Sequence, residues 1–529
     1  MLSGMPSRTS SADAVSAPKL QLPRQVSPPD FALSATPPHG VVGVEVVALP
    51  VLPGEDGTAP LLGPGAAELA DLLDVDLVGV LEVAGATGRA GEVTSIPVPQ
   101  GTADNADLGL VLLVGVGAQR GQDFRRAGAA LARAVRDRAS VATTIPAIAP
   151  DEALTPFVVG TMLGSFGFQW RSGPPEHQPV AQVVLADLSP DLQPVLVRAV
   201  AVGGAGWRSR MLATVPANLK NPPWLADQAR AVAAEHGLDI TVWDEQQLAD
   251  GGFGGILTIG QASATPPRLI RLDYAPPKAG RRTPTVALVG KGITFDTGGL
   301  SIKPGEAMVN MKRDMTGGAV VLSTMAALAA VGCPVRVVGL IAAAENAIGG
   351  NAVRPGDVVR HYGGRTTEVT NTDAEGRVVL ADALAYAVAE VEPDVIVDVA
   401  TLTGAMKVAL GQQVGGFFAN DDVLAGLLAA AAETAGEPLW RFPLSDSYEA
   451  KLSSTVADAD NGAGGPGAIT AALFLQHFVG EIPWAHLDVA SVGDAPEESY
   501  EWTTGPTGFG ARALLEWLGS AEPLAGIGS

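Results

Sequence analysis

The sequence predicts an α/β protein of two domains, each a mixed, mainly parallel sheet flanked by helices, with a long helix joining them. Three observations support this prediction. The chain has 529 residues, 47% of them hydrophobic and 17% charged, so it is globular but too long for one compact core. Short apolar runs alternate with helical stretches along most of it, which is typical of parallel strands covered by helices. A long helical stretch over residues 189–212 separates two such series.

The N-terminal residues have a different composition from the rest. Residues 1–38 are rich in Ser, Pro and Ala and lack the basic start and continuous apolar segment of a secretory signal. We therefore expect a disordered tail on a cytoplasmic protein. The single cysteine, Cys333, excludes an intrachain disulfide, which agrees with a reducing compartment.

The expected N-terminal α/β domain covers residues 39–188. Its apolar runs, which alternate with helical stretches such as Ala127–Arg138, are Val41–Val47, Leu77–Val83, Leu108–Val114 and Ala181–Ala186. The connecting helix of residues 189–212 contains Gly203 and Gly204, which we expect to break or soften it.

The expected catalytic domain covers residues 213–529. The pattern predicts strands at Thr285–Gly290, Val335–Ala342 and Asp394–Val399, and helices at Gly317–Val331 and Arg377–Val391. The uncharged stretch from Met315 to Val335 is long enough to cross a membrane, but its Gly, Ser, Thr and Pro residues favour a buried helix followed by a strand.

The charge balance limits the partners. The chain has 34 Lys and Arg against 56 Asp and Glu, a formal net charge of −22. Such a chain repels phosphate backbones and anionic membranes, so nucleic acid is an unlikely partner and no membrane association is expected. Carboxylates clustered in one site can all ionise only when cations lie among them.

A first group of polar residues follows the strand at Thr285–Gly290. Lys291 and Asp296 lie there among four glycines, and Lys303 and Asp314 come soon after. Ligands collect at loops after the carboxyl ends of parallel strands, so this group is a candidate site. A phosphate-binding loop or a simple ion pair would also explain it.

A second group lies in residues 371–377. In an extended segment residues two apart project to the same side, so Asp373, Glu375 and Arg377 would present two carboxylates and a guanidinium together. The alternative is that the carboxylates cap the helix that follows.

The sequence gives little support for a zinc site built on histidines or for a serine or cysteine hydrolase site. The chain has six histidines, none of them in a zinc-peptidase pair, and isolated ones such as His361 and His486 are more often structural. There is no Gly-X-Ser-X-Gly elbow, and Cys333 has no catalytic partner in the sequence. If the protein is a hydrolase, metal and carboxylates must do the chemistry.

At this point the sequence resembles the leucyl aminopeptidase (cytosol aminopeptidase) family. Its hallmark, Asn-Thr-Asp-Ala-Glu-Gly-Arg, is present without change at Asn371–Arg377. Further similar segments, which together span roughly residues 205–520, are Pro216–Asn218, Val289–Asp296, Ser301–Pro304, Ala400–Met406, Gly467–Phe474 and Trp484–Asp488.

The resemblance implies a dinuclear metal site. Its ligands would be Lys291, Asp296, Asp314, Asp373 and Glu375. Mn or Zn would be bound, with Mg or Co also compatible, and a water bridging the two ions would attack the peptide bond. Lys303 would polarise the scissile carbonyl, and Arg377 would hold a bicarbonate ion as general base.

The resemblance also implies a substrate and an assembly. The free amine of a peptide would lie against Asp314, and its first side chain, Leu, Met or a similar apolar one, would enter a pocket. The residues expected around it are Met311, Asp314, Thr401, Leu402, Gly404 and Ala490, with Gly493 on the same wall. Members of the family form hexamers, a dimer of trimers, and we expect a homo-hexamer here.

Two alternatives use the same sequence features. One is a narrower dipeptidase, for example for cysteinylglycine, because the pocket residues do not separate it from a broad aminopeptidase. The other is a non-catalytic scaffold or DNA-binding regulator. The acidic charge and the intact set of seven site residues argue against the second.

Overall fold

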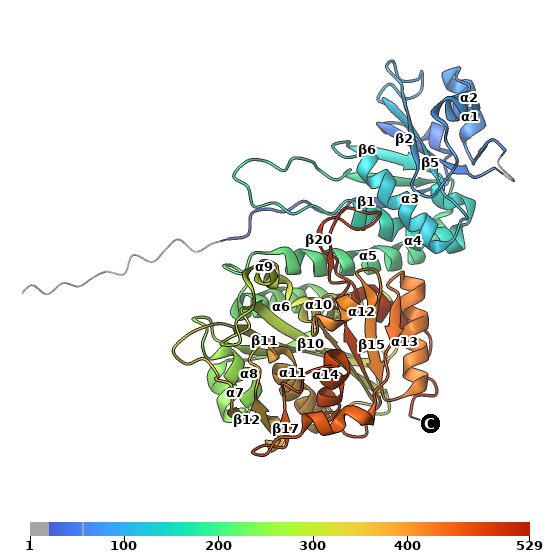
Figure 1. Cartoon of the computed structure of the whole chain (residues 1–529). Coiled ribbons are helices and arrows are strands. Elements are labelled where there is room, and N and C mark those ends of the chain that lie inside the picture. Colours follow the sequence, from blue (N-terminus) through green and yellow to red (C-terminus); the bar gives the residue numbers. More distant parts are fainter. Residues whose placement is uncertain (1–20, 55–57, 529) are drawn as a thin grey trace, which may run out of the picture.

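The computed structural model describes residues 21–54 and 58–528. Two α/β domains lie on opposite sides of one helix, α5 (Gln193–Thr214), which is green in Figure 1. Helix α5 packs on α4 (Pro150–Gly164) of the first domain and on α10 (Thr316–Ala327) of the second. The predicted α/β class, with mainly parallel sheets and a long helix between two domains, is confirmed.

The expected N-terminal tail is partly ordered. Residues 1–20 lie outside the described residues, but Asp30–Ser34 forms strand β1, which pairs in parallel with β7 (Gln182–Ala186) at the edge of the first sheet. The prediction of disorder is wrong for these five residues. The local composition gave no sign of the strand because its partner is about 150 residues away in the chain.

The first sheet has the order β1-β7-β6-β2-β5-β4, with β3 beside β2. Only β3 and β4 run antiparallel to their neighbours. The remaining elements of this domain are β2 (Val46–Leu52), β3 (Leu61–Leu62), β4 (Val93–Pro97), β5 (Leu110–Gly115), β6 (Ser140–Thr143), α1 (Ala66–Leu73), α2 (Leu77–Ala84) and α3 (Gly121–Ala134).

Two local predictions in this half are wrong. The apolar run Leu77–Val83 forms helix α2 instead of a strand, because Asp76 caps it by accepting from the Gly79 amide and because Leu77 and Leu81 bury one face at helical spacing. Gly203 and Gly204 do not interrupt α5. A Cβ on Gly203 would lie 2.5 Å from the Met162 sulfur, so the glycine lets α4 approach α5 closely.

The second sheet has the order β16-β15-β18-β14-β10-β11-β9-β8. Its centre, from β18 to β11, is parallel. The strands are β8 (Asp239–Trp243), β9 (Arg268–Tyr274), β10 (Thr285–Asp296), β11 (Arg336–Asn346), β14 (Val395–Ala400), β15 (Gly415–Ala419), β16 (Leu439–Arg441) and β18 (Trp484–Asp488).

Helices cover both faces of this sheet, because residues along each strand alternate between two cores. Val286 and Leu288 of β10 face one core, whereas Ala287 and Val289 face the other. The first core is covered by α6 (Pro222–His236), α10, α13 (Asp422–Ala435) and α15 (Ala511–Leu518), and the second by α8 (Gly254–Gly260), α11 (Glu375–Tyr386) and α14 (Gly467–Gln476).

Short elements decorate this domain. They are α7 (Glu245–Gly251), α9 (Gly305–Met308), α12 (Ala405–Leu410), the small sheet β12 (Asp357–Arg360), β13 (Thr366–Val369) and β17 (Ala459–Asp460), and the hairpin β19 (Asp494–Ala495) with β20 (Gly505–Pro506). The uncharged stretch that raised the membrane question, Met315 to Val335, contains the 12-residue helix α10 and ends just before β11 begins at Arg336. Within residues 21–54 and 58–528, no helix is long and apolar enough to span a membrane.

Candidate metal centre

The first group of predicted site residues lies on a strand and at its end. We expected Lys291 and Asp296 on a loop, but β10 continues through both, and its pairing with β11 shifts register between Ile293 and Asp296. A shift of this kind re-aims the side chains that follow it. Asp296 therefore stands at the carboxyl edge of the sheet, where ligands collect in parallel folds.

Two hydrogen bonds from protein groups fix the carboxylate of Asp296. Its Oδ1 accepts hydrogen bonds from the Gly298 amide at 2.8 Å and from Asn346 Nδ2 at 2.8 Å. Asn346 ends β11 and also donates to the Thr372 carbonyl at 3.1 Å. One amide side chain thus ties the first group to the second.

The second group is not extended as predicted. Residues 371–374 form a turn, in which Asn371 Oδ1 accepts from the Asp373 amide at 2.9 Å, and helix α11 begins at Glu375. The helix has no side-chain cap, and Asp373 contacts a lysine instead. Capping therefore does not account for these carboxylates, and the predicted convergence arises from a turn and a helix start.

Lys291 joins two of the carboxylates. Its Nζ lies 2.7 Å from Asp314 Oδ2 and 2.8 Å from Glu375 Oε1, and it donates to the Thr401 carbonyl at 3.0 Å. The side chain is 3% exposed. A Cβ on Gly376 would lie 2.7 Å from Lys291 Cε, so glycine at this position leaves room for the lysine side chain beside the helix start.

Lys303 joins the other two carboxylates. Its Nζ lies 2.8 Å from Asp296 Oδ2 and 2.5 Å from Asp373 Oδ1. Lys303 keeps contact with solvent at one side, unlike Lys291. The two lysines thus hold four carboxylates in two bridged pairs.

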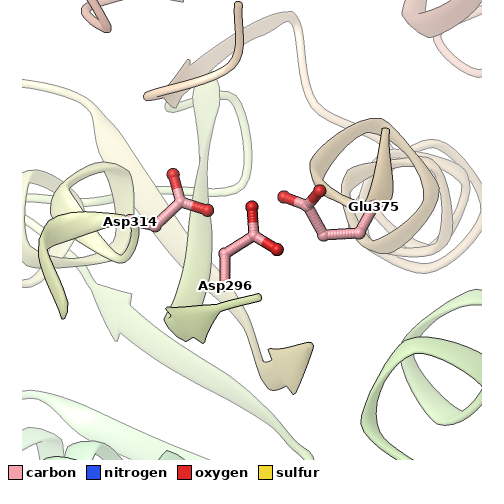
Figure 2. A group of neighbouring side chains, drawn as sticks. All are labelled: Asp296, Asp314 and Glu375. Carbon is pink, nitrogen blue, oxygen red and sulfur yellow. The ribbon is translucent and has the colours of Figure 1, made fainter. Parts of the chain in front are cut away.

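The donor set fits divalent metal ions. Asp296, Asp314 and Glu375 each offer an oxygen within 4.8 Å of the others, and Figure 2 shows the three side chains pointing toward one another from different parts of the domain. When all are ionised, four carboxylates and two ammonium groups leave two negative charges in the site (4 − 2 = 2). Carboxylate oxygens suit hard divalent cations, which would neutralise that excess.

The titration of the site reflects this excess. Burial raises the pKa of Asp296, and the charge of Glu375 raises it further. Burial likewise raises the pKa of Asp314 to about 8, against the opposing charge of Lys291. Burial alone would lower the pKa of Lys291, but the carboxylates around it raise the value above the ordinary one for lysine.

Arg377 lies beside the cluster without joining it. Its Nη1 donates to the Asn461 carbonyl at 2.8 Å, whereas its buried Nε has no hydrogen-bond partner among the residues described. Burial lowers the pKa of Arg377 to about 10, still high enough for a positive charge at neutral pH. A buried guanidinium with an unused donor is suited to bind an anion.

Two of the expected pocket residues, Thr401 and Met311, contact Asp314 of the cluster. Thr401 Oγ1 donates to Asp314 Oδ1 at 2.8 Å. Met311 opens a 3-10 turn (Met311–Arg313) that leads to Asp314. Lys220, fully buried, donates to the Ala213 carbonyl at 3.0 Å and to the Lys312 carbonyl, so it ties this turn to the end of α5.

Asp488 organises the loop that carries Thr401, Leu402 and Gly404. It ends one of the segments that resemble the family, but no role was predicted for it. Its carboxylate accepts from the amides of Leu402 at 3.0 Å, Thr403 at 3.0 Å and Ala490 at 3.2 Å. Asp488 ends β18, just as Asn346 ends β11. The rule that ligands gather at carboxyl ends of strands could have singled out both residues.

The two histidines considered are structural. His361 lies between Asp382 at 2.9 Å and Thr367 at 2.9 Å, away from the carboxylate cluster. His486 contacts Asp398 at 2.6 Å in the sheet.

The fold and the site together define a two-domain α/β protein with a lysine and carboxylate metal centre. Residues 208–515 match the catalytic domain of the cytosol aminopeptidase family, and residues 41–170 match its N-terminal domain. The chain belongs to the cytosol aminopeptidase family. It is therefore a metallo-aminopeptidase, a hydrolase that uses divalent metal ions to release N-terminal residues from peptides.

Relatives and solved structures agree over nearly the whole length. The chain is 42% identical over 477 residues to a probable cytosol aminopeptidase of Streptomyces avermitilis, covering 86% of this chain and 91% of that one. It is similar to the bottromycin maturation enzyme BotP in complex with Mn (TM-score 0.79, 38% identity, 90% and 99% covered). It is also similar to a variant of tomato leucine aminopeptidase (TM-score 0.81, 31% identity, 94% and 98% covered).

The raised pKa of Asp314 leads to a stability prediction. The folded value of about 8 exceeds the ordinary 3.8, so the stability that this group contributes is present below pH 3.8 and is lost as pH rises through 8. Without metal, Asp314→Asn should therefore raise the melting temperature at pH 8, with a smaller gain at pH 5. Added Mn²⁺ should stabilise wild type more than the variant, because a ligand has been removed.

Thermal unfolding in EDTA and in Mn²⁺ measures both effects. Asp107→Asn, an exposed carboxylate outside the cluster, is the control and should show neither. An equal Mn²⁺-induced shift in wild type and Asp314→Asn would contradict a ligand role for Asp314.

Proposed function

We propose that this enzyme binds two divalent metal ions and removes N-terminal Leu, Met or similar apolar residues from peptides. The observation that supports the proposal is the buried excess of carboxylate around Lys291 and Lys303 in a member of this family. Asp296, Asp373 and Glu375 would hold one ion. The other would be held by Lys291, Asp296, Asp314 and Glu375, so Asp296 and Glu375 would serve both ions.

Lys291 would bind as the neutral amine. The Lys291 ammonium lies between Asp314 and Glu375 and balances part of their charge. To bind a metal ion through its nitrogen, Lys291 would have to give up a proton. A lysine can respond in this way and an arginine cannot. Mn is favoured by the Mn complex of BotP, and Zn, Mg and Co suit the same ligands.

Each remaining side chain would have a separate task. The bound ions would supply the nucleophile by raising the acidity of a water molecule. Lys303, charged and partly exposed, would polarise the scissile carbonyl and stabilise the oxyanion. Asp314 would face the free α-amine of the peptide, so a peptide blocked at its N-terminus should not be a substrate.

Arg377 would hold a bicarbonate ion as general base. Its unpartnered Nε and its position beside Glu375 support this role, because an anion there would sit close to the ions and the attacked carbonyl. The side chain of the substrate's N-terminal residue would enter a pocket that we call the first-side-chain pocket. Its residues would be Met311, Asp314, Thr401, Leu402, Gly404 and Ala490.

The assembly and compartment belong to the same proposal. We expect a homo-hexamer, a dimer of trimers. We also expect it to act in the cytoplasm, because its relatives are named cytosol aminopeptidases. Ile302 and Val309, on the segment that carries Lys303, are 59% and 73% exposed in the single chain. Such apolar exposure beside the site supports contact with another subunit.

Metal removal provides the direct test of this function. Chelation should abolish hydrolysis of leucine anilide, and Mn, Zn or Co should restore it, because the proposed nucleophile depends on the bound ions. The rate is measured by anilide release, and the metal content by elemental analysis of the same samples. Full activity in a preparation shown to be metal-free would refute the two-metal proposal.

Arg377 is tested separately from the ligands. Arg377→Ala should retain two metal ions, while turnover falls by about 10²–10⁴-fold, the usual effect of losing general-base assistance. The Michaelis constant should change much less, since substrate binding depends on the metals, Asp314 and the pocket. Bicarbonate should stimulate depleted wild type but not the variant.

Arg354→Ala removes an exposed arginine paired with Asp357 and serves as the matched control. An unchanged turnover in Arg377→Ala, or equal bicarbonate stimulation in both proteins, would show that Arg377 only supports the start of α11 and that the base lies elsewhere.

A further inference from the structure

Residues 494–506 form a hairpin that leaves the catalytic domain and reaches the N-terminal domain. Its two ends pair as β19 and β20, where Asp494 lies opposite Pro506. Figure 1 shows this segment, in red at the label β20, between α5 and the first domain. We call residues 494–506 the interdomain hairpin. None of them belongs to the carboxylate cluster or to the first-side-chain pocket.

Helix α3 of the N-terminal domain holds the loop of the interdomain hairpin. Arg133 Nε lies 2.9 Å from Glu498 Oε1. Arg133 Nη2 donates to the Tyr500 carbonyl and, at 3.2 Å, to the Trp502 carbonyl. Arg126 lies over the Tyr500 ring, with its guanidinium carbon 4.0 Å from the ring centroid. A guanidinium that binds a carboxylate and two carbonyls fixes the orientation of a loop as well as its distance.

A buried ion pair and a buried arginine fix the hairpin further between the domains. Arg125 Nε of α3 lies 3.7 Å from Glu501 Oε1, and both side chains are buried. Arg210 of α5, fully buried, donates from Nε to the Pro506 carbonyl at 3.1 Å and from Nη1 to the Leu163 carbonyl at 2.8 Å. Buried charges are costly unless they are paired or hydrogen-bonded, so these contacts favour one position of the hairpin.

At its other end the hairpin contacts the turn that leads to Asp314. Asp494 Oδ2 lies 3.1 Å from Arg313 Nη1, and within the described residues the Arg313 side chain has no other hydrogen bond or ion pair. Both side chains line a cavity of about 450 Å³, so on that side the ion pair, and not close packing, holds the turn. Gln412 supports the base of the hairpin by donating to the Asp494 carbonyl at 3.0 Å.

We propose that the N-terminal domain contributes to the geometry of the active site through the interdomain hairpin, with Asp494 and Arg313 as positioning residues for Asp314. This inference rests on the proposed role of Asp314 as a metal ligand that faces the substrate amine. By holding the hairpin loop, α3 fixes Asp494, which in turn holds Arg313 and the residue after it. Such a ligand must keep its place closely, because a misplacement of about 1 Å can lower a rate by roughly 10²-fold.

Hydrogen exchange of the metal-free full chain tests this linkage without a substrate. The amides of Arg313 and Asp314 are hydrogen-bonded within their turn, so their exchange reports how firmly the turn is held. Arg133→Met should make the peptide of residues 310–315 exchange about threefold faster, and Asp494→Asn should have at least as large an effect. With Asp494 already replaced by Asn, Arg133→Met should add nothing, because the hairpin then no longer holds the turn.

The same variants should show the linkage in catalysis. With the Mn²⁺-loaded full chain, kcat/KM for leucine anilide should fall by about tenfold in Asp494→Asn and about threefold in Arg133→Met. The loss should lie mainly in KM, because Asp314 would contact the substrate amine. The double variant should be no slower than Asp494→Asn alone, whereas independent effects would multiply. Asp494→Glu, which keeps the charge, should retain most of the wild-type value.

Arg138→Met is the matched control, because Arg138 is an exposed arginine with no hydrogen bond or ion pair to the hairpin in the described part of the chain. It should behave as wild type in both measurements. Glu498→Gln removes the Arg133 ion pair from the side of the hairpin and should act in the same direction as Arg133→Met. This variant provides the test if Arg133→Met does not fold.

Unchanged exchange and unchanged kcat/KM in Arg133→Met and Glu498→Gln, with a lower melting temperature, would show that the hairpin only joins the domains and would overturn the inference. Effects that multiply in the double variant would also overturn it. If the exchange changes as expected but wild type does not hydrolyse leucine anilide, the linkage is supported and the proposed function itself is contradicted.

Discussion

Four carboxylates converge in a site that contains two ammonium groups. The resulting excess of negative charge is the constraint on which the structure of the catalytic domain around the site depends. Each lysine holds a pair of carboxylates that would otherwise repel one another across a medium of low dielectric constant. The raised pKa values of Asp296 and Asp314 show that the lysines do not fully compensate, since burial still favours the protonated acids. Divalent cations are the natural complement of such a site.

This constraint explains several features of the fold. Strand β10 extends beyond its apolar core so that Lys291 and Asp296 can both reach the cluster, and Asn346 on the adjacent strand fixes one carboxylate while also binding the turn before α11. Glycine at position 376 lets a helix start within reach of the lysine. The buried Lys220 couples the turn that carries Met311 to helix α5, so the helix between the domains also supports the site.

The sequence was sufficient to predict the fold class, because strand and helix periodicity are local properties. The residues expected to form the cluster came from the resemblance to a known family, and the structure brings their side chains together. The sequence did not predict that Lys291 lies within a strand or that Glu375 begins a helix, since both depend on how β11 and α11 pack. Strand β1 was missed because its partner is distant in the chain, and α2 because an apolar run of seven residues fits either structure.

The central claim is that the lysine-bridged carboxylates form a dinuclear metal site in which Lys291 is a neutral ligand. Diffraction from Mn²⁺-containing crystals, recorded on both sides of the manganese absorption edge, tests it most directly. The account predicts two anomalous peaks among Asp296, Asp314, Asp373 and Glu375, with Lys291 Nζ bound to one of them. A single peak, or a Lys291 still paired with Asp314 and Glu375 in fully loaded crystals, would contradict it.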